Sequence, residues 1–204
     1  MVREQFGRGL FYTRDSGGKH EMTPGEYVKW ARRRATQLNV TFNPTVADIE
    51  SMIRNEEAIR GDLYLDYDVA GDELSRVGLN ALLARAVSDE MVSHVFIPRR
   101  DRLARPTDAI DAVKMENVLR QNGLTIVFMD RLLSPIRTGR RPDTAEQIIA
   151  FLDYDAAGKH GRDLSDKMVH CQIALANGGF STGGRAPFAF DRWLVRRDGE
   201  RIRQ

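Results

Sequence analysis

The stretch LTIVFM, residues 124–129, is apolar at nearly every position. Such a run is typical of a strand that is buried on both faces of a parallel sheet. Three further β-rich runs precede it in the chain, GLFYT, DLYLD and HVFIP, at residues 9–13, 62–66 and 94–98. Between these runs the apolar residues recur at helical spacing. Strands that alternate with helices predict an α/β fold with a mostly parallel sheet and right-handed crossovers.

The clearest helix start is Thr23-Pro24-Gly25-Glu26. Threonine serves as an N-cap, proline is favoured at the first helical position, and a glutamate three residues after the cap completes a capping box. Apolar residues follow at helical spacing up to Leu38. Further helices are predicted over residues 44–60, around Leu79 to Ala86, and over residues 107–121.

The C-terminal third has a different organisation. After a polar loop at residues 134–143, a long helical segment is predicted over residues 143–177, and Gly158 and Gly161 are expected to bend or break it. One apolar stripe precedes the glycines and a second follows them. The second stripe either packs on the sheet or forms a seam between two copies; its members are Leu164, Met168, Cys171 and Leu175. Residues 1–142 are therefore predicted to form the main domain, and residues 178–204 a loop-like end.

Composition limits the class of protein. The chain has 204 residues, of which 42% are apolar and 29% charged, as in a globular domain. No apolar run approaches the about 20 residues that span a membrane, and the N-terminus lacks a secretory h-region. The single Cys171 excludes an internal disulfide and a zinc cluster. We therefore expect a cytoplasmic protein without a membrane segment.

A glycine-rich loop after the first strand raises the question of a nucleotide site. Gly17-Gly18-Lys19 is followed by His20, and the remaining positions of a P-loop are missing. SGGKHE, residues 16–21, also lacks the aspartate and second serine of the S-G-G-x-D-S loop. No dinucleotide fingerprint is present. The sequence therefore predicts no nucleotide cofactor.

Arginines near a serine point to phosphate chemistry instead. Arg14 and Ser16 follow the first strand, and Asp101, Arg102 and Arg105 follow the strand at 94–98. The carboxyl ends of parallel strands are where α/β sheets carry their sites. A phosphodiester that is attacked by a serine hydroxyl gathers negative charge, which guanidinium groups neutralise where no metal is bound. In the alternative interpretation, Ser16 caps a loop and Arg102 pairs with Asp101.

Two motifs carry a family resemblance. Tyr12, Arg14 and Ser16 fit Y-x-R-x-S, and residues 101–105 fit D-R-L-x-R. Between them, residues 66–71 resemble D-x-x-x-S-G, and Arg76-Val77-Gly78-Leu79 fits R-x-G-L. In this order the motifs resemble the catalytic domain of serine site-specific recombinases, the resolvase/invertase family. Residues 162–167 and 178–190 resemble the large members of that family.

The resemblance implies a resolvase-like fold followed by a long oligomerisation helix. It also implies a reaction: the serine cleaves and rejoins DNA through a 5′-phosphoserine intermediate, without metal or cofactor. The catalytic residues would be Ser16, Arg14, Arg102, Arg105, Asp101 and Arg76, with Tyr12, Asp66 and Arg162 in support. The partners would be double-stranded DNA and further copies of the chain, as dimers that pair into tetramers. The expected host is a bacterium or phage.

Some positions depart from the family pattern. Ala70 stands where the family has a serine, and the Glu-Arg pair that normally precedes the LS segment is replaced by Lys159 to Arg162, with Arg162 offset by one position. Residues 178–204 would be the truncated start of a DNA-binding region. The alternative is a degenerate, non-catalytic recombinase domain that acts as a dimerisation or regulatory partner.

Overall fold

The computed structural model describes residues 7–15, 22–67, 76–103, 109–137, 139–140, 142–180, 194–195, 199 and 201–202. The chain divides into two compact units, Met1–Gly161 and Arg162–Gln204. The first unit contains the sheet, the helices that cover it and the beginning of a long helix.

A six-stranded sheet in the order β2-β3-β1-β4-β5-β6 forms the centre of the first unit. Its four inner strands are parallel, namely β3 (Leu63–Tyr67), β1 (Arg8–Asp15), β4 (Val92–Phe96) and β5 (Thr125–Val127). The two edge strands, β2 (Ile59–Arg60) and β6 (Leu132–Leu133), are antiparallel to their neighbours. The predicted α/β fold with a mostly parallel sheet is confirmed.

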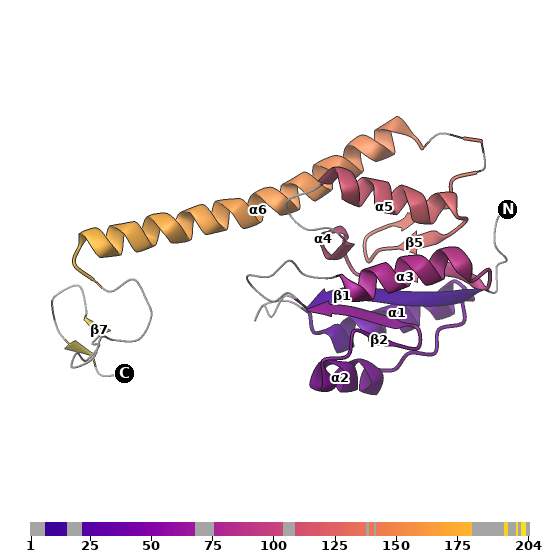
Figure 1. Cartoon of the computed structure of the whole chain (residues 1–204), viewed down its shortest axis with the longest axis horizontal. Coiled ribbons are helices and arrows are strands. Elements are labelled where there is room, and N and C mark those ends of the chain that lie inside the picture. Colours follow the sequence, from indigo (N-terminus) through magenta and orange to yellow (C-terminus); the bar gives the residue numbers. More distant parts are fainter. Residues whose placement is uncertain are drawn as a thin grey trace. The chain divides into compact units, whose positions relative to one another are not determined.

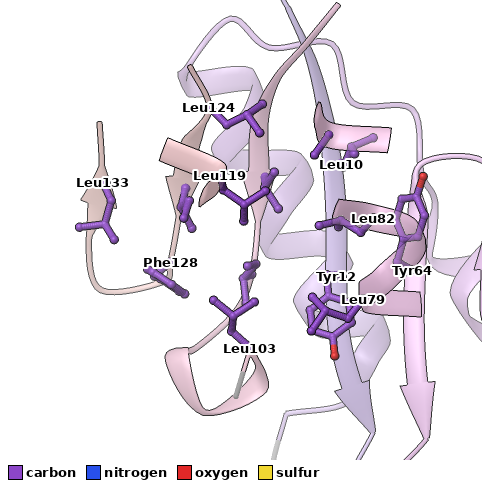
Figure 2. Packing of buried hydrophobic residues seen from close by; sticks show 14 of the residues in the cluster. Leu10, Tyr12, Tyr64, Leu79, Leu82, Leu103, Leu119, Leu124, Phe128 and Leu133 are labelled. Carbon is purple, nitrogen blue, oxygen red and sulfur yellow. The ribbon is translucent and has the colours of Figure 1, made fainter. Parts of the chain in front are cut away.

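Helices cover both faces of the sheet (Figure 1). The helices α1 (Pro24–Gln37) and α2 (Val46–Asn55) lie on one face, and α3 (Val77–Ser88) and α5 (Ala109–Gln121) lie on the other. Successive strand residues point to opposite faces. Leu10 and Tyr12 of β1 accordingly pack under α3 and α5, whereas Phe11 packs under α1 and α2. Figure 2 shows the first of these two cores.

The connections between the strands reverse the strand order at β1. From β1 the chain proceeds to β3 on one side of it, and then crosses to β4 on the other side. In open α/β sheets the reversal of strand order opens a crevice at the carboxyl ends of the strands, where ligands bind. The register of β1 and β3 pairs Arg14 with Asp66 at this edge.

The helix start at Thr23 has the predicted capping box. The Thr23 hydroxyl accepts from the Glu26 amide, and the Glu26 carboxylate accepts from the Thr23 amide. The predicted end of the next helix is wrong, because α2 stops at Asn55. Glu56 adopts a left-handed conformation with φ of 54°, and Ile59 and Arg60 then pair with β3 around Gly61.

Other boundaries also differ from the prediction. The strand predicted at residues 94–98 runs from Val92 to Phe96, and the apolar run 124–129 contains only three strand residues before the chain turns into β6. The helix predicted over 107–121 is described from Ala109 onwards. The predicted strands and helices occur in the predicted order.

The long helix α6 spans Thr144–Asn177 and is helical through Gly158 and Gly161. Ala150 and Tyr154, near its start, join the core under α3 and α5. Met168, Cys171 and Leu175 of the second stripe are exposed, so these side chains are not part of a core. In the second unit, β7 (Leu194–Val195) and β8 (Arg201–Ile202) form an antiparallel pair within the segment predicted as a loop.

Candidate active site

The predicted site residues that the structure describes gather at the carboxyl edge of the sheet. Arg14 ends β1, Asp66 lies in β3, and Arg76 precedes α3. After β4 the chain forms a four-residue helix, α4 (Arg100–Leu103), which contains both Asp101 and Arg102. Four segments of the chain, namely β1, β3, the start of α3 and α4, thus bring these side chains together.

The short helix α4 is the meeting point of three arginines. An Nη of Arg14 lies 3.5 Å from the Asp101 carbonyl oxygen, and Arg76 donates to the Leu103 carbonyl at 2.9 Å. Arg102 donates to the Arg14 carbonyl at 3.4 Å. Arg14 of β1 therefore contacts α4, and Arg102 of α4 contacts β1. These contacts concentrate positive charge at the carboxyl ends of β1 and β4.

Arg102 is buried, with only 2% of its surface exposed. Its Nη2 lies 3.7 Å from the Asp101 carboxylate, an ion pair that is longer than a hydrogen bond. Asp101 also pairs with Arg99 at 3.3 Å. The pairing of Arg102 with Asp101 that the alternative interpretation expects is thus present. Arg102 makes this ion pair and also its contact with the Arg14 carbonyl, so it stays next to the other arginines.

Tyr12 and Asp66 form a buried pair beneath the arginines. The Tyr12 hydroxyl donates to the Asp66 carboxylate at 3.0 Å. Burial, together with the neighbouring Asp66 charge, raises the pKa of the Tyr12 phenol well above its ordinary value, so the phenol remains a proton donor. Figure 2 shows that the Tyr12 hydroxyl and Leu103 of α4 lie toward the same end of the sheet.

Asp66 also caps α3 from the neighbouring strand. Its two carboxylate oxygens accept from the amides of Gly78 and Leu79 at 2.7 and 3.1 Å. The helix has no cap from its own N-cap side chain, Arg76. A carboxylate at a helix N-terminus satisfies free amides and complements the helix dipole. Asp66 therefore holds α3, and with it Arg76, against the sheet.

Four residues singled out in the sequence lie wholly or partly outside the described structure. Ser16 and Arg105 are outside the described residues, as is Ala70. Arg162 lies within α6, but its side chain is outside the description. Their roles remain predictions from the sequence.

Sequence reasoning missed a second group of charged residues beside α4. Arg100 donates through Nε and Nη2 to the two carboxylate oxygens of Glu116, both at 3.2 Å, and through Nη1 to Asp153 at 2.6 Å. A signal for Glu116 exists in the sequence. It shares a helix face with Ala112 and Leu119, and all three are buried. Nothing in the sequence distinguishes Arg100 from the neighbouring Arg99.

Metal and membrane features are absent from the part of the chain that the structure describes. Among the described residues, no group of three or more histidine, cysteine or carboxylate side chains is arranged to hold a metal ion. Within the same ranges, no helix has both the length and the apolar character that crossing a bilayer requires.

Comparison with known families gives one match. The model of the family described as "Resolvase, N terminal domain" matches residues 39–156, more than half of the chain. The matched segment includes Asp66, Arg76, Asp101 and Arg102, and it begins after β1. A comparison with curated proteins finds no match.

Proposed function

The chain belongs to the family of resolvase N-terminal domains, the catalytic domains of serine site-specific recombinases, and from this premise we propose that Ser16 cleaves and rejoins DNA. The observation that supports the proposal best is the convergence of Arg14, Arg76 and Arg102 on α4. Ser16 follows Arg14 by two residues, directly after the end of β1.

In the proposed reaction, the Ser16 hydroxyl oxygen attacks the scissile phosphorus. The bond between phosphorus and the 3′ oxygen breaks, and the departing oxygen takes up a proton to become a 3′-hydroxyl. The 5′ phosphate remains esterified to Ser16, and the serine proton passes to the surrounding solvent or to a base. One phosphodiester bond is exchanged for another, so rejoining reverses the step without ATP.

The arginines supply the stabilisation that this step needs. The attacked phosphate gathers negative charge on its non-bridging oxygens, which guanidinium groups match with charge-assisted, bidentate hydrogen bonds. A preorganised donor of this kind contributes about 3–4 kcal/mol to lowering the barrier. We assign this role to Arg14, Arg76, Arg102 and Arg105, with Asp101 orienting Arg102.

Tyr12 and Asp66 act through the fold in this proposal. The polar atoms of the pair are occupied by each other and by the α3 amides. We therefore assign them to holding Arg76 and β1 in place rather than to contact with the phosphate.

The partners proposed are double-stranded DNA and other copies of the chain. Large apolar side chains of α6 are exposed in both halves of the helix, among them Ile149, Leu152 and Ile173. Such residues support helix-to-helix association, first into dimers and then into tetramers on DNA.

The second candidate function is a regulatory domain that associates without cleaving DNA. It is favoured by Ala70, which removes a hydroxyl from the family's motif.

The test is formation of a covalent adduct. The full chain is incubated in EDTA with a pool of end-labelled duplexes, denatured, and resolved on a gel that separates free DNA from protein-linked DNA. We expect a labelled, protease-sensitive species that forms without divalent metal. The label should be on the DNA fragment whose 5′ phosphate is joined to the protein, that is, at the 3′ end of that fragment. Ser16→Ala should reduce it to background.

Ser88→Ala is the matched control, because Ser88 is exposed on the last turn of α3. It should form as much adduct as the parent protein. An adduct that persists in Ser16→Ala would refute the nucleophile. No adduct from the parent protein, together with intact dimers, would favour the regulatory candidate, and saturable ATP binding would refute both.

A further inference from the structure

Arg100 is the residue that links α4 to the helices around it. The side chain is 9% exposed, and it directly precedes Asp101 in the chain. Its guanidinium makes two bonds to Glu116 of α5 and one to Asp153 of α6. Arg100 therefore connects three elements that are up to 53 positions apart in the sequence.

The side chains around Arg100 hold its guanidinium in a fixed position. The guanidinium carbon lies 5.6 Å from the centre of the Phe128 ring and 5.8 Å from that of Tyr154. The Tyr154 hydroxyl donates to Glu116 at 3.1 Å, which fixes the carboxylate that receives Arg100. Burial disfavours the Arg100 charge, but the carboxylates of Glu116 and Asp153 outweigh it, so the pKa of the guanidinium is raised.

The helix α4 needs such outside support. It has only four residues, too few for a helix to be stable by its own hydrogen bonds. On one side Arg14 and Arg76 contact its carbonyl oxygens. On the other side Arg100 ties it to α5 and α6. The place of Arg102 in the site therefore depends on how firmly Arg100 is held.

We infer that Arg100 is a positioning residue for the proposed reaction, and that Asp153 transmits the position of α6 to α4 through it. This inference rests on the proposed function. Arg100 does not contact the phosphate in this account. It sets where Asp101 and Arg102 lie, so that a helix available for contact with a second copy of the chain also sets the geometry of the phosphate-binding arginines.

Asp153 is the point at which this link is accessible. It is 39% exposed, and it also pairs with Arg131 at 3.1 Å. An open cavity of about 460 Å³ adjoins it, with Arg100, Asp101 and Arg131 in its lining. Replacing the Asp153 carboxylate by an amide therefore changes the link without opening a hole in the core. Glu116, in contrast, is buried, and its loss would leave Arg100 without its main partner.

The test compares Asp153→Asn in the full chain with the parent protein by two readouts. The first is hydrogen exchange of the amides in α4, one of which, that of Arg102, donates to the Arg99 carbonyl at 3.1 Å. We expect this exchange to become about tenfold faster, the size expected for the loss of one charge-assisted hydrogen bond. The second is the single-turnover rate of adduct formation, which should fall about tenfold while DNA affinity changes less than about twofold.

Asp130→Asn is the matched control. Asp130 is 62% exposed, lines the same cavity, and pairs with Arg131 but not with Arg100. It should leave both readouts at the parent level, and Asp153→Glu, which keeps the charge, should restore most of the lost rate. Unchanged α4 exchange in Asp153→Asn would overturn the inference, as would faster exchange with an unchanged rate of adduct formation.

Failure of the proposed function gives a different result. If the parent protein forms no adduct, the nucleophile assignment is refuted, and the exchange readout alone then decides whether α6 holds α4 through Asp153. Faster exchange that is specific to Asp153→Asn would support the structural link, and equal exchange in the two variants would overturn it.

Discussion

Asp66 serves the fold and the site at the same time. Its carboxylate accepts hydrogen bonds from the Tyr12 hydroxyl and from two amides of α3. A residue with this many buried partners is expensive to replace, because each partner would be left without an acceptor. Motif residues such as Asp66 and Tyr12 thus lie beside the arginines and still act by holding elements in place.

At the residue scale, His94 should make stability depend on pH. It is half-buried in β4, its Nδ1 lies 2.7 Å from the Ser93 hydroxyl, and burial lowers the pKa of its imidazole from 6.5 to about 4. Between these two values the unfolded chain binds a proton at this ring and the folded protein does not. The free energy of unfolding should therefore fall as pH drops from 6.5 toward 4.

The measurement is urea unfolding between pH 7.5 and pH 5, where most carboxylates remain ionised. His94 contributes at most about 1.4 kcal/mol per pH unit, the limit for one proton. His94→Gln should flatten the decline, whereas His170→Gln, an exposed change on α6, should leave it as in the parent protein. Equal slopes in the two variants would contradict the role of His94.

At the element scale, α3 packs so closely on β3 that there is no room for a methyl group at Gly78. A Cβ at Gly78 would lie 2.9 Å from the Leu65 carbonyl oxygen and 3.0 Å from the Asp66 carboxylate. These atoms belong to a strand and to the helix cap, so they cannot move aside freely. Gly78→Ala should therefore destabilise the protein by about 1–3 kcal/mol, although alanine normally stabilises a helix interior by about 1 kcal/mol over glycine.

Asn80→Ala provides the comparison, because Asn80 is exposed on the same helix. It should leave the denaturation midpoint unchanged or raise it slightly. A Gly78→Ala protein that is as stable as the parent would show that α3 does not need this close approach to the sheet.

Elements also show which boundaries local chemistry encodes. The start of α1 is predictable because the capping box uses four consecutive residues, Thr23 to Glu26. The end of α2 is not, because it lies at Glu56, a glutamate in the left-handed conformation that glycine or asparagine normally adopts at a helix end. The short helix α4 has no local signal either, and its contacts come from Arg14, Arg76, Glu116 and Asp153.

At the scale of the whole molecule, exposed apolar residues on α6 should mediate association. Ile149 is 50% exposed, and Leu152 beside it is 58% exposed. We expect the full chain to sediment as a dimer. Ile149→Glu should shift it to the monomer, because a two-fold interface would bring two like charges together. The circular dichroism spectrum should stay that of the parent protein, since Ile149 is half exposed and outside the core.

Met91→Glu tests whether any exposed apolar residue has the same effect. Met91 is 68% exposed and precedes β4 on the first unit. This variant should remain a dimer. Dissociation by Met91→Glu alone, with Ile149→Glu still dimeric, would place the interface elsewhere.

The sequence by itself determined the alternation of strands and helices, the capping box at Thr23 and the grouping of the site residues into motifs. These features depend on neighbours within a few positions, so composition and spacing are sufficient to read them. The family assignment rests on the same local order of motifs and agrees with the match over residues 39–156.

Only the tertiary structure decided which of these residues meet. Arg14 contacts α4 across 87 positions, and Arg100 contacts α6 across 53. The tertiary structure also shows that Asp66 caps α3. It reveals the group of Arg100, Glu116 and Asp153, which no sequence motif marks. The physical reason is that such contacts depend on the order of strands in the sheet, which brings distant segments to one edge.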